Sequence, residues 1–220
     1  MKNPIPKNNP DEFIPFKYPI KVKRKLIRGF KKRSSDFLDV LLTRRTEQKL
    51  NSPSQVNISE LLYYSNRVHS IHQDDFGYLV TKRTCPSAGA RHPIDLLVSI
   101  PTKEKRRILE YYNPIDHSLN ELSIPKSTQE SFFEEINENL SIENSCIIWF
   151  SIQGDKTGSR YENPESLYWR DAGALLYCIQ LISTYLGLKT CPLGSLASNS
   201  FYSLFKSDKL ISGGGILIGL

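Results

Sequence analysis

The sequence contains few cysteines and no long apolar run, and both absences restrict its class. Its four cysteines lie far apart in 220 residues and form no C-x-x-C pair, so we expect neither a disulfide framework nor a thiol-rich zinc site. No stretch reaches the ~20 apolar residues that a membrane helix needs. The opening segment MKNPIPKNNP also lacks the apolar core of a signal peptide. We therefore expect a cytoplasmic protein with reduced thiols and no membrane contact.

Sequence motifs of several catalytic classes are missing as well. Gly213–Gly215 are consecutive and precede an apolar segment, whereas a dinucleotide-binding loop needs G-x-G-x-x-G between a strand and a helix. No Walker loop, nucleophile elbow or kinase signature occurs. His69 and His72 stand near two aspartates, but their spacing suits a polar loop better than a structural metal site. We expect no bound metal.

Acidic residues are scarce in the N-terminal quarter of the chain. Residues 1–50 carry 14 Lys and Arg against five Asp and Glu, and the whole chain has a net charge of +6. The densest basic segment, Lys21–Arg33, could attract an anionic partner. Because no RNA-binding motif accompanies it, we interpret this segment as a solvated basic face and expect no nucleic-acid partner.

The distribution of prolines and apolar residues suggests an arm followed by one domain. Residues 1–20 hold five of the 13 prolines, so residues 1–34 are expected to form a basic, proline-containing N-terminal arm. The remaining residues, 35–220, are numerous enough to bury one core. We therefore expect a single domain after the arm.

Apolar periodicity predicts several long helices and short strands in that domain. Asn57 or Ser59 is expected to cap the second helix, and Gly187 to end the longest one. Gly173, inside that helix, costs ~1 kcal/mol relative to Ala, which predicts close approach of another backbone or a flat ligand. Short strands between long helices favour an α+β fold with a mostly antiparallel or mixed central sheet flanked by helices. The expected helices cover residues 35–42, 57–68, 128–139 and 166–186, and the expected strands residues 96–100, 107–113, 119–124, 146–152 and 213–220.

Three short segments offer groups that a planar, phosphorylated cofactor needs. In residues 43–46, TRRT, adjacent guanidiniums can bind a phosphate through bidentate hydrogen bonds. In residues 83–93, RTCPSAGARHP, small residues between prolines can form a rigid backbone shelf against which a ring lies. In residues 187–195, GLKTCPLGS, a Gly- and Pro-containing loop can present an amide to a ligand.

These segments, together with an R-Y motif and a W-R-D-A-G helix between the second and third of them, resemble the nitroreductase superfamily. They are most similar to its SagB-type branch, the FMN-dependent dehydrogenases of thiazole/oxazole peptide biosynthesis. The likeness extends from about Arg44 to Gly219, and PSAGARHP is its most specific part. It implies a nitroreductase-like α+β fold and a homodimer with two FMN sites at the subunit interface.

The resemblance also implies roles for individual residues. Pro86, Ser87, Ala88 and Gly89 correspond to the loop that faces the flavin ring, and Leu193 and Gly194 to the backbone near the flavin nitrogen N5. Arg44, Arg45 and Thr46 correspond to contacts with the phosphate and the ring edge.

Two departures from the family pattern concern the phosphate and the catalytic base. The sequence stops at Leu220, so basic residues that many relatives carry beyond the last strand are absent, and Lys156 or the N-terminal lysines would replace them. Where azoline-oxidising relatives carry a Lys-Tyr pair, this sequence reads Arg160-Tyr161. Because Arg does not act as a base, Tyr161 is the expected proton acceptor, with Arg160 supplying a stabilising positive charge.

The resemblance thus implies oxidation of a peptide's thiazoline or oxazoline ring to the azole, with cyclodehydratase proteins as further partners. Tyr161 would take the ring α-proton while hydride passes to the flavin, and dioxygen would reoxidise the cofactor. Two alternatives remain: a nitro- or quinone-reducing flavoenzyme that uses NAD(P)H, and a non-catalytic subunit of a peptide-modifying complex.

Overall fold

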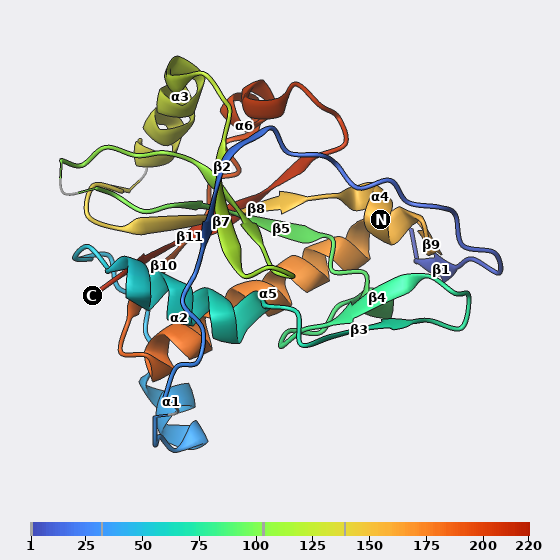
Figure 1. The fold of residues 1–220 in the computed structure, drawn as a ribbon, viewed down its shortest axis with the longest axis horizontal. Helices are drawn as coiled ribbons and strands as arrows, with labels where there is room; N and C mark the ends of the chain where they lie inside the picture. Colours follow the sequence, from blue (N-terminus) through green and yellow to red (C-terminus); the bar gives the residue numbers. More distant parts are fainter. Residues whose placement is uncertain (1, 32, 103, 139) are drawn as a thin grey trace.

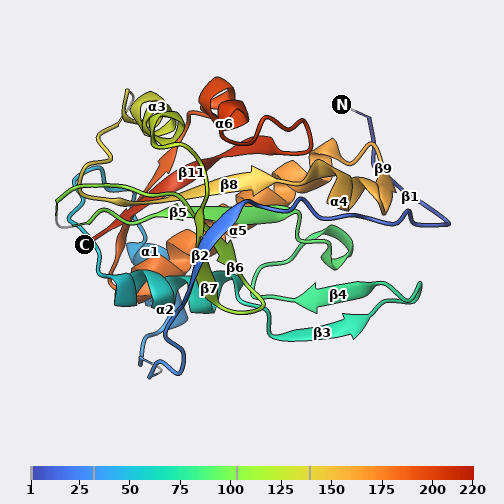
Figure 2. The same cartoon turned by 45° about the horizontal axis from the view of Figure 1, so that its top comes forward.

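A seven-stranded, fully antiparallel sheet forms the centre of the fold, with helices on both faces (Figures 1 and 2). The computed structural model describes residues 2–31, 33–102, 104–138 and 140–220. The sheet confirms the expected α+β class with an antiparallel centre. In spatial order its strands are β10 (Lys189–Leu193), β11 (Ile211–Gly219), β8 (Cys146–Ile152), β5 (Ile94–Ser99), β6 (Glu110–Asn113), β7 (Ser118–Leu122) and β2 (Ile20–Lys25).

Alternation along the central strands divides the core into two layers. On β8, Ile148 and Phe150 pack into one cluster, while Ile147 and Trp149 pack into the other, because successive side chains of a strand point to opposite faces. The first cluster lies under α2 (Gln55–Asn66) and α5 (Glu165–Tyr185), and the second under α3 (Lys126–Asn137) and α6 (Ser198–Phe205). Both faces of the sheet are therefore covered by helices.

The long helices lie within two residues of their expected positions. The helix expected over residues 166–186 is α5, and the one expected over residues 35–42 is α1 (Phe37–Thr43). The expected cap of α2 was wrong. Ser54 caps this helix, and the Asn57 side chain accepts a hydrogen bond from the Ser54 backbone N–H. This reciprocal arrangement is a capping box, so Asn57 belongs to the first turn rather than to the cap.

The strand expected over residues 213–220 begins two residues earlier, so Gly213–Gly215 lie inside β11. β11 begins at Ile211, and its register against β8 shifts between Ser212 and Gly215. A Cβ atom on Gly215 would lie 2.6 Å from Trp149 Cε3 and 2.8 Å from the Ile148 carbonyl oxygen, so only glycine fits this close approach of two strands. The glycine run therefore makes a bulge that lets β11 pass Trp149.

Several short elements were not expected from the sequence. The N-terminal strand β1 (Ile5–Pro6) pairs with β9 (Tyr161–Glu162), and β2, within the expected arm, is an edge strand of the large sheet. His72 lies in strand β3 (Ser70–Gln73) of a hairpin and not in a loop; the other strand is β4 (Leu79–Lys82). The remaining elements are α4 (Gly154–Gly158) and a 3₁₀ turn, η1 (Ala88–Ala90).

The described residues contain neither a membrane-spanning helix nor a cluster of metal ligands. No helix in the described part of the chain is long and apolar enough to cross a membrane. Within residues 2–31, 33–102, 104–138 and 140–220, no group of three or more His, Cys, Asp and Glu side chains is arranged to hold a metal ion.

Candidate functional site

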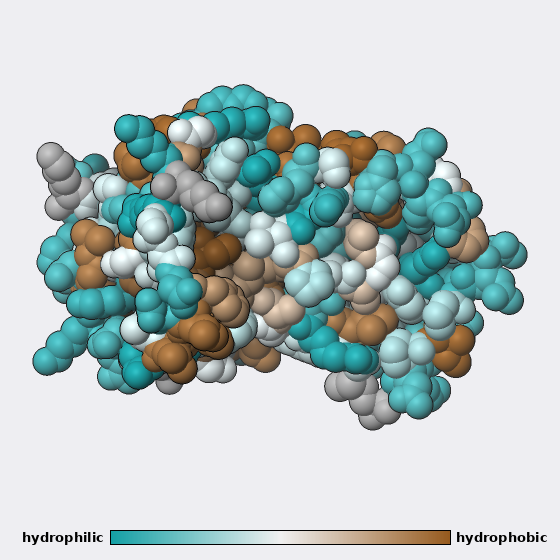
Figure 3. All heavy atoms as spheres, turned by 90° about the horizontal axis from the view of Figure 1, so that it is seen from below, coloured by the Kyte–Doolittle hydropathy of each residue, from teal (hydrophilic) through white to brown (hydrophobic). Residues whose placement is uncertain are grey.

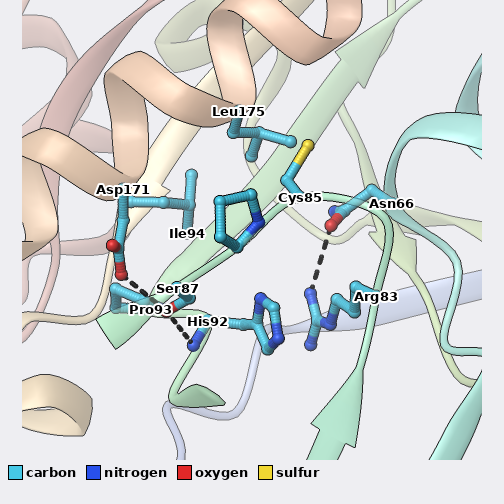
Figure 4. A pocket seen from close by; sticks show the side chains of 10 residues that line it. Asn66, Arg83, Cys85, Ser87, His92, Pro93, Ile94, Asp171 and Leu175 are labelled. Carbon is cyan, nitrogen blue, oxygen red and sulfur yellow. Dashed lines mark hydrogen bonds between the residues drawn. The ribbon is translucent and has the colours of Figure 1, made fainter. Parts of the chain in front are cut away.

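Asp171 of α5 holds the loop Pro86–Gly89 through hydrogen bonds (Figure 4). The Ser87 hydroxyl donates to Asp171 Oδ2 over 2.5 Å, and the Ala88 N–H donates to Oδ1 over 3.1 Å. Ser87 Oγ in turn accepts a hydrogen bond from the His92 N–H at 2.8 Å. The cavity behind the loop measures only about 10 Å³, space for one water at most. A planar ligand could therefore rest only on the outer side of the loop.

Gly89 brings the loop into contact with the candidate base. Its φ is +57°, a left-handed conformation that favours glycine. A Cβ atom at this position would lie 3.1 Å from the Tyr161 hydroxyl oxygen and 3.6 Å from Arg160 Cγ. The expected ring-facing loop and the expected proton acceptor, 72 positions apart in the sequence, are thus direct neighbours in space.

The guanidinium of Arg160 lies over an aromatic ring. Its central carbon is 4.0 Å from the centroid of the Phe76 ring, a cation–π contact. One terminal nitrogen, Nη1, is buried and has no hydrogen-bond partner among the described residues. The charge of Arg160 is therefore held at the turn between β3 and β4, next to Tyr161 in sequence.

The expected phosphate contacts follow the C-terminus of α1. Arg44 is the C-cap residue of this helix, and Arg45 Nη1 donates to the carbonyl oxygens of Leu42 and Arg44 at 2.7 and 2.8 Å. Thr46 forms a parallel bridge with Thr190. Arg45 thus stabilises the end of α1, whereas Arg44 caps the helix through its backbone N–H, which donates to the Val40 carbonyl oxygen.

Leu193 and Gly194 lie at the end of β10. Leu193 pairs with Gly215 of β11, and a Cβ atom built on Gly194 would meet no other atom within 4 Å. The backbone after β10 is therefore accessible to a ligand, as a contact near the flavin would require.

The candidate residues form two groups at opposite ends of α5. Thr46 pairs with Thr190, just after the helix ends at Tyr185, whereas Ser87 is bound to Asp171, near its beginning. The 14 residues from Asp171 to Tyr185 correspond to about 20 Å along a helix. Within one chain, therefore, the phosphate-binding candidates Arg44–Thr46 do not lie beside the ring-facing loop Pro86–Gly89.

Asp171 is a functional candidate that the sequence analysis did not assign. Burial raises its pKa, and the hydrogen bonds from Ser87 and Ala88 lower it again. Asp171 lies between the buried residues Tyr168, Ala172 and Leu175 of an apolar helix. A carboxylate in such surroundings needs a hydrogen-bond partner, and this sequence pattern could have identified Asp171 as a candidate. Its role is to position the loop.

Lys156, considered above as a phosphate contact, is directed elsewhere. Its Nζ donates to the His92 carbonyl oxygen at 3.2 Å. Burial lowers the pKa of this lysine to about 8; the carboxylate of Asp95 opposes the shift, whereas Arg83 and Arg91 add to it. Lys156 is half-buried, and its ammonium is directed toward the backbone of His92 and not toward a phosphate on the surface.

The lowered pKa of Lys156 predicts a rise in stability with pH. An unfolded Lys, with its ordinary pKa of 10.5, binds more protons than the folded one with a pKa of about 8, so the free energy of unfolding should increase between these values. From pH 7.5 to pH 9.5 the contribution is about 2 kcal/mol. Urea unfolding should show this gain in the wild type and not in Lys156→Met; an equal gain in both would contradict the assignment.

Comparison with known proteins identifies the fold. No family model and no curated protein matches the sequence. A candidate nitroreductase from Ralstonia eutropha JMP134 is 16% identical, covers 96% of both chains and has a TM-score of 0.67. A chain of the E. coli microcin synthetase McbBCD complex with truncated pro-MccB17 is 16% identical, with 89% of this chain and 77% of that chain covered and a TM-score of 0.59.

A third solved structure contains a flavin. It is a candidate nitroreductase from Desulfovibrio desulfuricans in complex with FMN, 13% identical, with 85% of this chain and 87% of that chain covered and a TM-score of 0.53. At these identities the likeness defines the architecture. The chain has a nitroreductase-like fold, and two of these three structural neighbours are named as nitroreductases.

Proposed function

We propose that this protein is an FMN-dependent dehydrogenase that oxidises azoline rings of a ribosomal peptide to azoles. The observation that carries the proposal is the close approach of the Tyr161 hydroxyl to Gly89 of the ring-facing loop. With Tyr161 as proton acceptor, the base would stand beside the surface on which a flavin ring would lie. Support comes from the FMN complex and from the peptide-bound microcin synthetase among the fold neighbours.

The residues present fit a flavin mononucleotide. Pro86–Gly89 form a fixed shelf whose inner side is filled, Arg44 is half-buried at the end of α1, and the backbone at Gly194 is open. When bound, FMN would supply the hydride acceptor. Asp171 would keep the shelf rigid through Ser87 and Ala88, and Tyr161 would hold the proton removed from the substrate carbon.

A second copy of the chain would complete each site. In one chain the ring-facing loop and the phosphate-binding candidates Arg44–Thr46 lie about 20 Å apart along α5. The phosphate-binding candidates of a second copy would therefore have to face this chain's loop. Between α1 and α5 lies an apolar groove of about 420 Å³, flanked by exposed apolar residues (Figure 3). Phe37 of α1 and Tyr177 of α5 line this groove and are exposed, and Leu38 and Leu42 of α1 and Trp169 of α5 are exposed on the same two helices.

The same face accounts for Gly173. Trp169, Gly173 and Tyr177 follow one another at helical spacing and are all exposed, and a Cβ on Gly173 would meet nothing within 4 Å. The close neighbour expected at this glycine would then be the α5 helix of the second copy or the shared flavin.

We expect the protein to be a homodimer in solution. Burial of the apolar stripe on α5 and α1 would stabilise the pair, so light scattering should give twice the chain mass of 25.2 kDa. The double variant Trp169→Glu, Tyr177→Glu should be monomeric, while Glu134→Gln on α3 should remain dimeric. A wild-type monomer that binds FMN in full would contradict the shared site.

Two spectroscopic measurements test the proposed reaction. The purified protein should be yellow, with one non-covalent FMN per chain and no FAD, because a single basic segment is available for phosphate. Under air, an azoline-containing peptide should be converted to the azole, and NAD(P)H should not bleach the flavin. Rapid bleaching by NAD(P)H without azole formation would favour a nitro- or quinone-reducing enzyme. A colourless protein that cannot take up FMN would favour a non-catalytic subunit.

A further inference from the structure

A groove of about 610 Å³ opens beside Tyr161 on the side away from the candidate phosphate residues. Its walls come from the N-terminal segment of residues 3–16, here called the strap, together with α4, β9 and Lys209, which precedes β11. Figure 2 shows the strap passing α4 and β9 at one end of the molecule. Tyr161 is thus shared between the ring-facing loop and this groove.

The strap is bound to the catalytic segment by main-chain hydrogen bonds. The Lys7 N–H donates to the Arg160 carbonyl oxygen at 2.9 Å, and the Asp11 N–H donates to that of Ser159 at 2.8 Å. Ile5 and Pro6 pair antiparallel with Glu162 and Tyr161. The strap is therefore a fixed wall of the groove, and it shows that an extended chain can lie along this segment.

Two side-chain contacts fasten the strap at other points. The Tyr78 hydroxyl donates to the Pro10 carbonyl oxygen at 3.0 Å, which ties the strap to the β3–β4 hairpin. The Phe16 N–H donates to Gln153 Oε1 at 2.8 Å. In the described part of the chain β1 pairs only with β9, so each of these strands retains one edge that an extended backbone could join.

The groove is acidic although the whole chain is basic. Within it, Lys7 and Asp11 form an ion pair at 2.5 Å. Of the other charged residues that line the groove, Glu12, Asp155 and Glu162 are negative and Lys209 is positive, and all four are exposed. This leaves an excess of two negative charges, against +6 for the chain, so the field at this site favours a positively charged occupant.

We propose that the groove binds an extended, positively charged peptide segment and leads it past Tyr161 to the ring-facing loop. The peptide nature of the occupant rests on the proposed function; its charge follows from the lining residues. Specificity would come from Glu12, Asp155 and Glu162, which line the groove together with Tyr161. Basic side chains next to the heterocycle would favour a substrate, and acidic ones would disfavour it.

Binding of two synthetic peptides tests this proposal without turnover. Both are fluorescein-labelled octapeptides with a central thiazole, one flanked by Lys and the other by Glu, and anisotropy gives their Kd values on the FMN-loaded protein. We expect the Lys-flanked peptide to bind at least ~10-fold more tightly at low salt, with the preference falling as the ionic strength rises. Equal affinities in the wild type would overturn the proposal.

Charge variants locate the effect. In the triple variant Glu12→Gln, Asp155→Asn, Glu162→Gln, the preference should fall to within ~2-fold while FMN remains bound. In Lys209→Gln it should widen, and in the control Glu134→Gln on α3 it should not change. If the triple variant kept the wild-type preference, the groove would not be the binding site. An unchanged preference in Lys209→Gln would lead to the same conclusion.

The proposed reaction and the groove can fail separately. Charge-dependent binding without any azole formation from an azoline peptide would contradict the dehydrogenase activity and support peptide binding in the groove. Azole formation with no charge preference would support the dehydrogenase activity and contradict charge-selective binding in the groove.

Discussion

Replacing Tyr161 with Phe is expected to lower turnover of an azoline peptide by at least ~10²-fold, while the protein stays yellow and melts normally. The ring would still pack against Gly89, whereas the hydroxyl oxygen, 3.1 Å from the Gly89 Cβ position, would be lost. General-base assistance is typically worth ~10²–10⁴ in rate. The measurement is kcat by azole formation, together with flavin content and Tm of both proteins.

Arg160→Lys is the matched control for this experiment. It keeps a positive charge beside Tyr161 and restores the Lys-Tyr pair of azoline-oxidising relatives, so most activity should remain. A wild-type rate in Tyr161→Phe would make Tyr161 a packing residue. The base would then be sought at Tyr202, which is exposed on α6. His92 is poorly suited, because burial lowers its pKa to about 3 and its Nε2 lies 3.0 Å from the Thr81 carbonyl oxygen.

Replacing both Arg44 and Arg45 with Ala is expected to release the flavin. Hydrogen bonds to charged groups contribute about 1.5–3 kcal/mol each, so loss of the phosphate contacts should raise the Kd for FMN by ~10²-fold or more. Because Arg45 also binds the Leu42 and Arg44 carbonyl oxygens at the end of α1, the single variants separate the two roles. Arg44→Ala should account for most of the effect on affinity.

Dialysis followed by fluorescence titration with FMN measures this effect. Arg106→Ala, which removes an exposed arginine outside the candidate site, should bind FMN as the wild type does. A double variant that stays fully yellow after exhaustive dialysis would show that the phosphate is held by other residues.

The local sequence pattern was sufficient to predict those helices and strands whose form does not depend on distant parts of the chain. β8 was expected at residues 146–152 and is found there, because the length of this apolar run and its Ile, Trp and Phe content between polar loops favour a buried strand. α5 was expected within one residue at each end, because 21 residues of helical pattern precede Gly187 in a left-handed conformation.

The parts of the candidate site that depend on distant pairing could not be read in this way. β1 and β9 have two residues each and carry no period of their own. Asp171 meets Ser87 across 84 positions, and the separation of Thr46 from Ser87 along α5 follows only from the assembled fold. Motif likeness supplied the candidate residues, and the three-dimensional structure showed that Thr46 and Ser87 lie far apart along α5.

The place of β11 in the sheet has a consequence for how the protein is made. β11 lies between β8 and β10, and its residues 211–219 pair with β8 residues 146–152. About 60 residues separate the two strands in the sequence. At a translation rate of ~5–20 residues per second, this edge of β8 stays unpaired for roughly 3–12 s before β11 is synthesised. An apolar strand with an open edge is a site for intermolecular pairing. Newly made chains should therefore be most prone to aggregate, and most dependent on chaperones, in the interval before Ile211–Gly219 leave the ribosome.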